Sequence, residues 1–120
     1  MKRILLLILL LLPSTPGLTA TPLDGLYVGQ RSIVRGSPAT CPANGPASWR
    51  ITDGKFAYRF WAGVIPVQVA GDGSLNGNII YSPGHGAHNE ATVAGTISGG
   101  SLEADAEWRA CQLHFSLKKK

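Results

Sequence analysis

The 120-residue sequence predicts an all-β fold, in which a single domain forms an antiparallel up-and-down meander of eight strands. Three observations predict it. Short stretches alternate between polar and apolar residues, turns separate them every roughly eight to twelve residues, and no stretch after residue 20 has the periodicity of an amphipathic helix. An even number of sequential strands can close and so remove exposed edges. We therefore expect a closed or nearly closed small barrel.

The alternating stretches define the expected strands. We place them near residues 25–35, 47–52, 55–61, 64–70, 74–82, 91–98, 101–108 and 111–118. The first strand is apolar on both faces, so its inward face stays open: Leu26, Val28 and Val34 lie on one face, and Tyr27, Arg31 and Ile33 on the other. Pro66 in the fourth strand cannot donate to a ladder, which favours an edge or a bulge there.

Tight turns keep the apolar residues of these strands on one face. Asp53-Gly54, Ala62-Gly63, Gly99-Gly100 and Arg109-Ala110 are expected as two-residue turns, and 71–73 as a three-residue loop. The expected pairs are Ile51 with Phe56, Trp49 with Tyr58, Phe60 with Ile65, Tyr58 with Val67, Phe56 with Val69, Val69 with Leu75, Ile97 with Leu102, and Ala106 with Leu113. A slip of one residue would turn each apolar set to the other face, so the register is strongly specified.

The direction of the chain places all the long loops at one end of the barrel. Loops 36–46 and 82–90 share this end with two of the tight turns. Cys41 lies in the first loop, and Cys111 begins the last strand at the same end. Two cysteines in an exported chain of this size most simply form one disulfide, so we expect a Cys41–Cys111 bridge.

The first twenty residues predict an exported protein. Lys2 and Arg3 precede an apolar run at 4–12, and a segment of small residues ends at Ala20. This run is too short to span a bilayer, so residues 1–20 are interpreted as a signal peptide and 21–120 as the barrel domain. We expect a periplasmic or extracellular protein without a membrane span.

The charge of the mature domain is small. The chain has 11 basic and 7 acidic residues, and without Lys2 and Arg3 nine basic residues remain against seven acidic ones, a net charge of +2. These basic residues do not cluster with aromatic ones, so we expect no nucleic-acid partner.

Loop 82–90 contains the residues that could bind a metal. His85, His88 and Glu90 could supply three nitrogen and oxygen ligands to zinc or copper. A rigid spacing and a fourth ligand are lacking, so the favoured interpretation is a polar loop, and we expect no cofactor.

Catalytic residues are not expected either. Glu103, Asp105 and Glu107 alternate on one outer face rather than in a cleft that would shift a pKa. No serine or cysteine has the sequence context of a nucleophile. The sequence therefore favours a protein that is not an enzyme.

The aromatic residues of the inner face leave two interpretations open. They fill the core, which is favoured because a small domain needs its core for stability, or they line a cavity for one small ligand. The residues of that cavity would be Trp49, Tyr58, Tyr81 and Trp108. Trp61 differs from them, because it points outward beside the long loops, as aromatic anchors of partners do.

We therefore expect a monomeric, non-enzymatic binding module that engages an unknown protein or envelope component through loops 36–46 and 82–90. The expected contact residues are Trp61, His85, His88 and Arg109. A small-ligand carrier is the alternative, and metal binding by His85, His88 and Glu90 is a second one.

Several segments carry a resemblance to known proteins. The series DGLYVG, ITDGKFAY, VAGDGSLNG, VAGTISGGSLEA and CQLHFSL resembles short exported β-domain proteins of alphaproteobacteria. This resemblance implies a periplasmic β-domain and brings no activity with it. The architecture is also similar, more loosely, to small avidin-type and lipocalin-type barrels, but none of their binding motifs occurs here.

Overall fold

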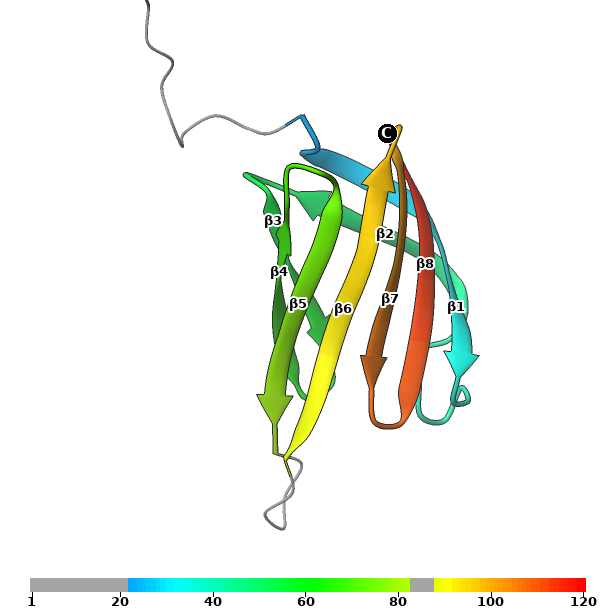
Figure 1. Ribbon diagram of the computed structural model, residues 1–120. Coiled ribbons are helices and arrows are strands. Elements are labelled where there is room, and N and C mark those ends of the chain that lie inside the picture. The colour runs from blue at the N-terminus through cyan, green and yellow to red at the C-terminus, as the bar shows by residue number, and fades with distance from the viewer. Residues whose placement is uncertain (1–21, 83–87) are drawn as a thin grey trace, which may run out of the picture.

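The computed structural model describes residues 22–82 and 88–120 as an all-β domain (Figure 1). Its strands are β1 (Gly25–Arg35), β2 (Gly45–Ile51), β3 (Lys55–Phe60), β4 (Gly63–Val69), β5 (Ser74–Tyr81), β6 (Asn89–Ser98), β7 (Ser101–Trp108) and β8 (Cys111–Lys119). These bounds lie close to the expected ranges, although β2 and β6 each begin earlier. No helix occurs in the described part of the chain. The expected signal peptide lies outside the described residues.

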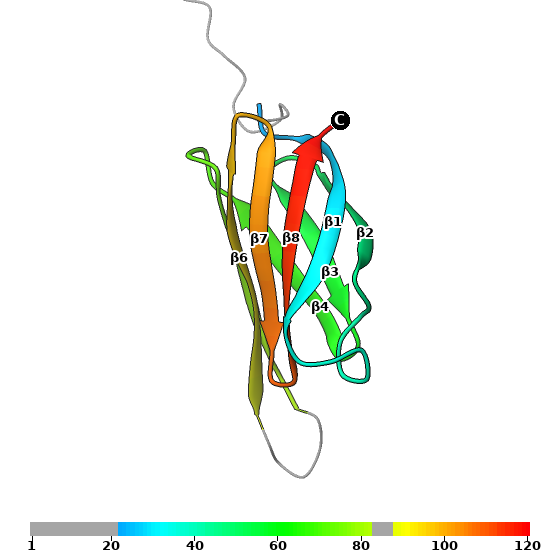
Figure 2. The same cartoon turned by 90° about the vertical axis from the view of Figure 1, so that its right-hand side faces the viewer.

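All eight strands belong to one antiparallel sheet that curls into a nearly closed barrel. Their order is β2-β1-β8-β7-β6-β5-β4-β3, so that β1 lies between β2 and β8, as Figure 2 shows for the cyan and red strands. β2 and β3 follow each other in sequence but form the two edges of the sheet. Among the described residues their only backbone bridge joins Thr52 and Lys55. We call the unpaired gap between β2 and β3 the seam.

The core lies on the inner face of the curled sheet. Buried apolar side chains come from every strand, and those with the least exposed surface include Tyr27, Ile51, Ile65, Val67, Leu75, Val93, Leu102, Leu113, Phe115 and Leu117. The open question about β1 is thereby answered: Tyr27 is 1% exposed and faces inward, whereas Val34 is 57% exposed.

The registers confirm several of the expected turns. Ile97 pairs with Leu102 across Gly99-Gly100, and Ala106 pairs with Leu113 across Arg109-Ala110. The loop 71–73 brings Val69 opposite Leu75, also as expected. These connections join β4 to β5, β6 to β7 and β7 to β8, and the inward faces of these five strands had been assigned correctly.

The turn between β3 and β4 was wrongly placed. Trp61-Ala62, and not Ala62-Gly63, forms it, because Phe60 pairs with Gly63. The pairs are therefore Tyr58 with Ile65 and Phe56 with Val67. This register differs from the expected one by two residues, which leaves the same side chains inward because side chains alternate with a period of two.

The backbone pairing expected between β2 and β3 was also wrong, except at the bridge of Thr52 with Lys55 beside the turn. Asp53 and Gly54 have φ angles of 55° and 72°, as a tight hairpin turn requires. The backbone pairs of Ile51 with Phe56 and of Trp49 with Tyr58 do not form. Instead the ring of Trp49 packs 4.6 Å from that of Phe56 and 4.5 Å from that of Phe115 on β8.

Candidate functional site

One end of the barrel carries the disulfide and most of the long connections. Cys41 and Cys111 are bridged, with their Cα atoms 5.4 Å apart, so the predicted disulfide is confirmed. The bridge attaches the β1–β2 connection to the start of β8. Figure 1 shows this connection, the β3–β4 turn and the β7–β8 turn at the same end, which we call the disulfide end.

Trp61 is the exposed aromatic residue of the disulfide end. Its side chain is 68% exposed, and its ring contacts Phe60 and Tyr81 edge-on, with centroid distances of 6.4 and 5.9 Å. A depression of about 510 Å³ lies between Trp61 and the β1–β2 connection, which holds Cys41. Its lining residues are Ala39, Thr40, Cys41, Pro42, Phe60, Trp61, Trp108 and Ala110. The indole therefore borders an open apolar hollow and is not covered by the loop.

A second depression adjoins the first around Trp61. It has a volume of about 360 Å³ and is lined by Trp61, Tyr81, Asn89, Trp108, Arg109 and Ala110. The structure thus brings together Trp61 and Arg109, two of the predicted contact residues. Trp108 borders both hollows, and its indole nitrogen is buried without a hydrogen-bond partner in the described part of the chain.

Of the predicted histidine contacts, His88 is not among the residues that line these hollows. His85 lies outside the described residues. His88 is exposed, and its Nδ1 lies 3.2 Å from the hydroxyl of Ser82. Glu90 accepts a hydrogen bond of 2.9 Å from the side-chain amide of Asn78. Within residues 22–82 and 88–120 no group of three potential ligands is arranged for a metal ion.

The seam is a further groove, on the side of the barrel. Its upper part, next to the Asp53-Gly54 turn, is a depression of about 510 Å³. It is lined by Ser48, Trp49, Arg50, Thr52, Asp53, Lys55, Phe56 and Ala57. Its lower part, of similar volume, is lined by Val28, Gly29, Arg31, Pro42, Pro46, Ala47, Ser48, Trp49, Tyr58, Arg59 and Phe115. The two parts share Ser48 and Trp49. Pro42 connects the lower part with the hollow at Trp61, so the three form one row.

The four residues of the expected ligand cavity are all buried, but they do not enclose one cavity. Trp49 and Tyr58 line the seam, whereas Tyr81 and Trp108 line the disulfide end. The ring of Phe60 packs with the second set, 5.1 Å from Trp108 and 5.5 Å from Tyr81, and the ring of Tyr58 lies 6.5 Å from that of Trp108, which links the two sets. The rings thus form a continuous cluster that fills the interior. Burial raises the pKa of Tyr58 to about 12, against a smaller opposing effect of Arg31, so its phenol stays protonated at neutral pH.

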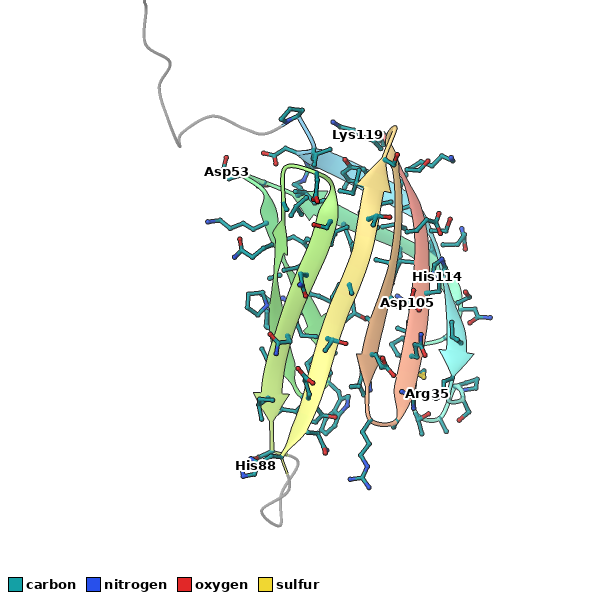
Figure 3. All side chains as sticks on the ribbon, in the orientation of Figure 1. Arg35, Asp53, His88, Asp105, His114 and Lys119 are labelled. Atoms are coloured by element: carbon teal, nitrogen blue, oxygen red, sulfur yellow. A yellow bond between two sulfur atoms is a disulfide. The ribbon has the colours of Figure 1, made fainter. Side chains whose placement is uncertain are left out.

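The carboxylates of the outer acidic row on β7 are bonded to side chains of β8 and β1. His114 on β8 lies beside Asp105, as Figure 3 shows, with its Nδ1 2.8 Å from that carboxylate. Its Nε2 lies 2.8 Å from the carboxylate of Glu103. Arg35 forms an ion pair of 3.0 Å with Glu107. Gln112 and Ser116 donate to Asp105 and Glu103. These carboxylates lie on a partly exposed strand surface, bonded to side chains, as the alternation had indicated.

Sequence reasoning missed the seam and the cations beside it. Arg50, Lys55 and Arg59 occupy outward positions of β2 and β3, where the alternation marks them only as solvent-facing. The sequence does show several cations around the Asp53-Gly54 turn. Their number indicates a binding surface only once β2 and β3 are seen to separate beyond that turn. No helix in the described residues is long and apolar enough to cross a membrane. No protein-family model, curated protein or solved structure matches this chain.

Proposed function

We propose that this protein is a non-enzymatic exported binding module that engages a protein or envelope component through its disulfide end. The observation that carries the proposal is the exposed indole of Trp61 beside an open apolar hollow of about 510 Å³. Aromatic side chains in such positions are the residues that most often dominate binding energy at interfaces. The disulfide supports the proposal, because a loop held by a covalent bridge loses less entropy when a partner binds.

The test compares capture of partners from an envelope extract by wild type and by the Trp61→Ala variant. We expect wild type to retain a partner that the variant releases. Ile80→Ala is the matched control, because Ile80 is a similarly exposed apolar residue, 63% exposed, on the outer face of β5. Equal capture by all three proteins would contradict the proposal.

A small-ligand carrier is the second candidate, supported by the volume of the lower seam. About 510 Å³ lies within the range of small-molecule sites, and Trp49, Tyr58 and Phe115 supply apolar walls. A ligand seated there would alter the fluorescence of Trp49. Screening small hydrophobic anions by tryptophan fluorescence, with Trp49→Phe as the control, tests this candidate.

A further inference from the structure

We infer that the seam is a binding site for an extended acidic peptide segment, which adds to β3 as an edge strand. This inference rests on the proposed role as a binding module, and it assigns to a different surface a partner of defined chemistry.

The first support is the unpaired backbone of β3. The N–H of Val69 donates to the carbonyl of Gly54 at 2.8 Å, so position 54 bonds to β4. Residues of an antiparallel strand alternate in the direction of their backbone groups, which turns positions 55, 57 and 59 toward the seam. Lys55 bonds there to Thr52. Among the described residues Thr52–Lys55 is the only backbone bridge across the seam, so Ala57 and Arg59 have no backbone partner on that side.

The facing edge of β2 is the poorer template. The N–H of Lys120 donates to the carbonyl of Leu26, so position 26 of the chain bonds toward β8 and the odd positions of β1 bond to β2. By the same alternation Pro46, Ser48 and Arg50 face the seam. Pro46 has no N–H to offer, and proline is a common device for blunting an edge strand. β3 therefore presents the more complete edge to an incoming strand.

The second support is the pattern of side chains around the seam. At inward positions the rings of Trp49, Phe56 and Tyr58 line the two depressions. Outward positions of the same strands carry Arg50, Lys55 and Arg59. An added strand alternates in the same way, so it would present apolar side chains to the rings and the intervening side chains to the cations.

The third support is the sign of the charge. Arg50, Lys55 and Arg59 form no ion pair within the described residues, and Arg31 at the base of the groove donates its Nε to the carbonyl of Ala43. Of the acidic residues that the structure describes, only Asp53 lines either part of the seam. Glu103, Asp105 and Glu107 lie on β7, which does not border the seam, and each is bonded to another side chain. An occupant with carboxylates at alternate positions is therefore complementary to this edge.

The probe that tests the inference is a fluorescently labelled synthetic peptide of alternating glutamate and valine, measured by fluorescence anisotropy. We expect wild type to bind it and the Arg59→Glu variant to bind it about tenfold more weakly, because the glutamate beside position 59 then meets a like charge instead of a cation. Lys118→Glu is the matched control, since Lys118 is an exposed cation on β8 away from the seam. It should bind as wild type does.

The backbone contribution is tested by Ala57→Pro, which removes an N–H that faces the seam without removing a bond to β4. We expect about tenfold weaker binding, corresponding to one lost hydrogen bond and the clash of the ring. Should this variant unfold, peptides N-methylated at one or the other set of alternate residues give the same information. Methylation of only the set that donates to β3 should abolish binding.

The outcomes separate the two proposals. Peptide binding that survives Arg59→Glu and both methylated sets would overturn the inference. Binding of polygalacturonate, a glycan with the same sign of charge, without binding of the peptide would overturn it too. If Trp61→Ala loses the captured partner while wild type ignores the peptide, the inference fails and the proposed function stands. If the peptide binds the seam while Trp61→Ala captures as wild type does, the inference stands and the disulfide end loses its role.

Discussion

The carboxylate of Asp24 accepts a hydrogen bond of 2.6 Å from the backbone N–H of Asp53, although 29 positions separate the two residues. Its other oxygen accepts from the N–H of Gly54 at 2.9 Å. The residue that precedes β1 thus holds the turn between the two unpaired strands. At the upper end of the seam this contact replaces part of the ladder that β2 and β3 lack.

Replacing Asp24 should therefore destabilise the barrel more than an ordinary surface change. We expect Asp24→Ala to lower the free energy of unfolding by about 1–2 kcal/mol, because two backbone donors lose a charged acceptor. Urea unfolding followed by circular dichroism measures it. Asp72→Ala is the control, because the side chain of Asp72 accepts its hydrogen bonds from Ser74, two positions along the chain, and so joins no distant segments. A loss no larger than that of the control would show that the turn does not depend on Asp24.

Removing the Cys41–Cys111 disulfide should lower the free energy of unfolding more than Asp24→Ala does. Cys41 and Cys111 are 70 positions apart, and closing a loop of this length restricts the unfolded chain by roughly 4 kcal/mol in the chain-entropy account. We expect the double variant Cys41→Ala, Cys111→Ala to unfold at a markedly lower urea concentration. Reductant should shift wild type in the same direction and leave the double variant unchanged. Unaltered stability of the double variant would contradict this expectation.

The contacts of His114 predict a pH dependence of stability. Its hydrogen bonds to Asp105 and then to Glu103 raise its pKa above the ordinary value of 6.5. The stability that this adds is fully present below about pH 6.5, and it is lost as the pH rises through the higher pKa that His114 has in the folded protein. Bonds from Ser116 and then His114 lower the pKa of Glu103 from 4.5, so its contribution is present above 4.5 and lost as the pH falls through the lower folded value.

These signs define a window in which the cluster stabilises most, between about 4.5 and 6.5. Within it, wild type should exceed His114→Gln in unfolding free energy by a small amount, since the groups are partly exposed. The difference should shrink at alkaline pH. Urea unfolding of both proteins across the pH range measures it, and a constant difference would count against the assignment.

The glycines of the inner face should not tolerate side chains. A Cβ at Gly95 would lie 2.5 Å from the Cβ of Ala104 and press on the carbonyl of Glu103. We expect Gly95→Ala to destabilise the protein by about 1–3 kcal/mol through overpacking. Gly45→Ala is the matched control, because no atom lies within 4 Å of its Cβ position. Equal thermal midpoints of the two variants would show that the sheet yields at Gly95.

Zinc binding is expected to be weak and insensitive to the loop histidines. Glu90 is bonded to Asn78, and His88 lies against Ser82, so neither is held toward a common ion. Zinc titration by calorimetry should give the same result for wild type and for the double variant His85→Ala, His88→Ala. A clear loss of affinity in the variant would establish a metal site and change the functional proposal.

The alternating pattern predicted faces better than it predicted edges. It placed Trp49, Tyr58, Tyr81 and Trp108 inward, because the period of two is a property of each strand alone. It could not show that β2 and β3 separate after the Thr52–Lys55 bridge, because that depends on how rings from several strands fill the interior. Nor could it show the contact of Asp24 with Asp53, because alternation within a strand carries no information on which distant turn a polar side chain will reach.

The place of β1 in the sheet has a consequence for biosynthesis. β1 is the first strand to be made, but one of its two partners is β8, and the N–H of Lys120 donates to the carbonyl of Leu26. A nascent chain that lacks β8 would leave one edge of β1 without its ladder, and such long-range pairing is slow to form. The barrel can therefore be completed only after synthesis of the last strand. Until then the chain presents open edges that chaperones could recognise.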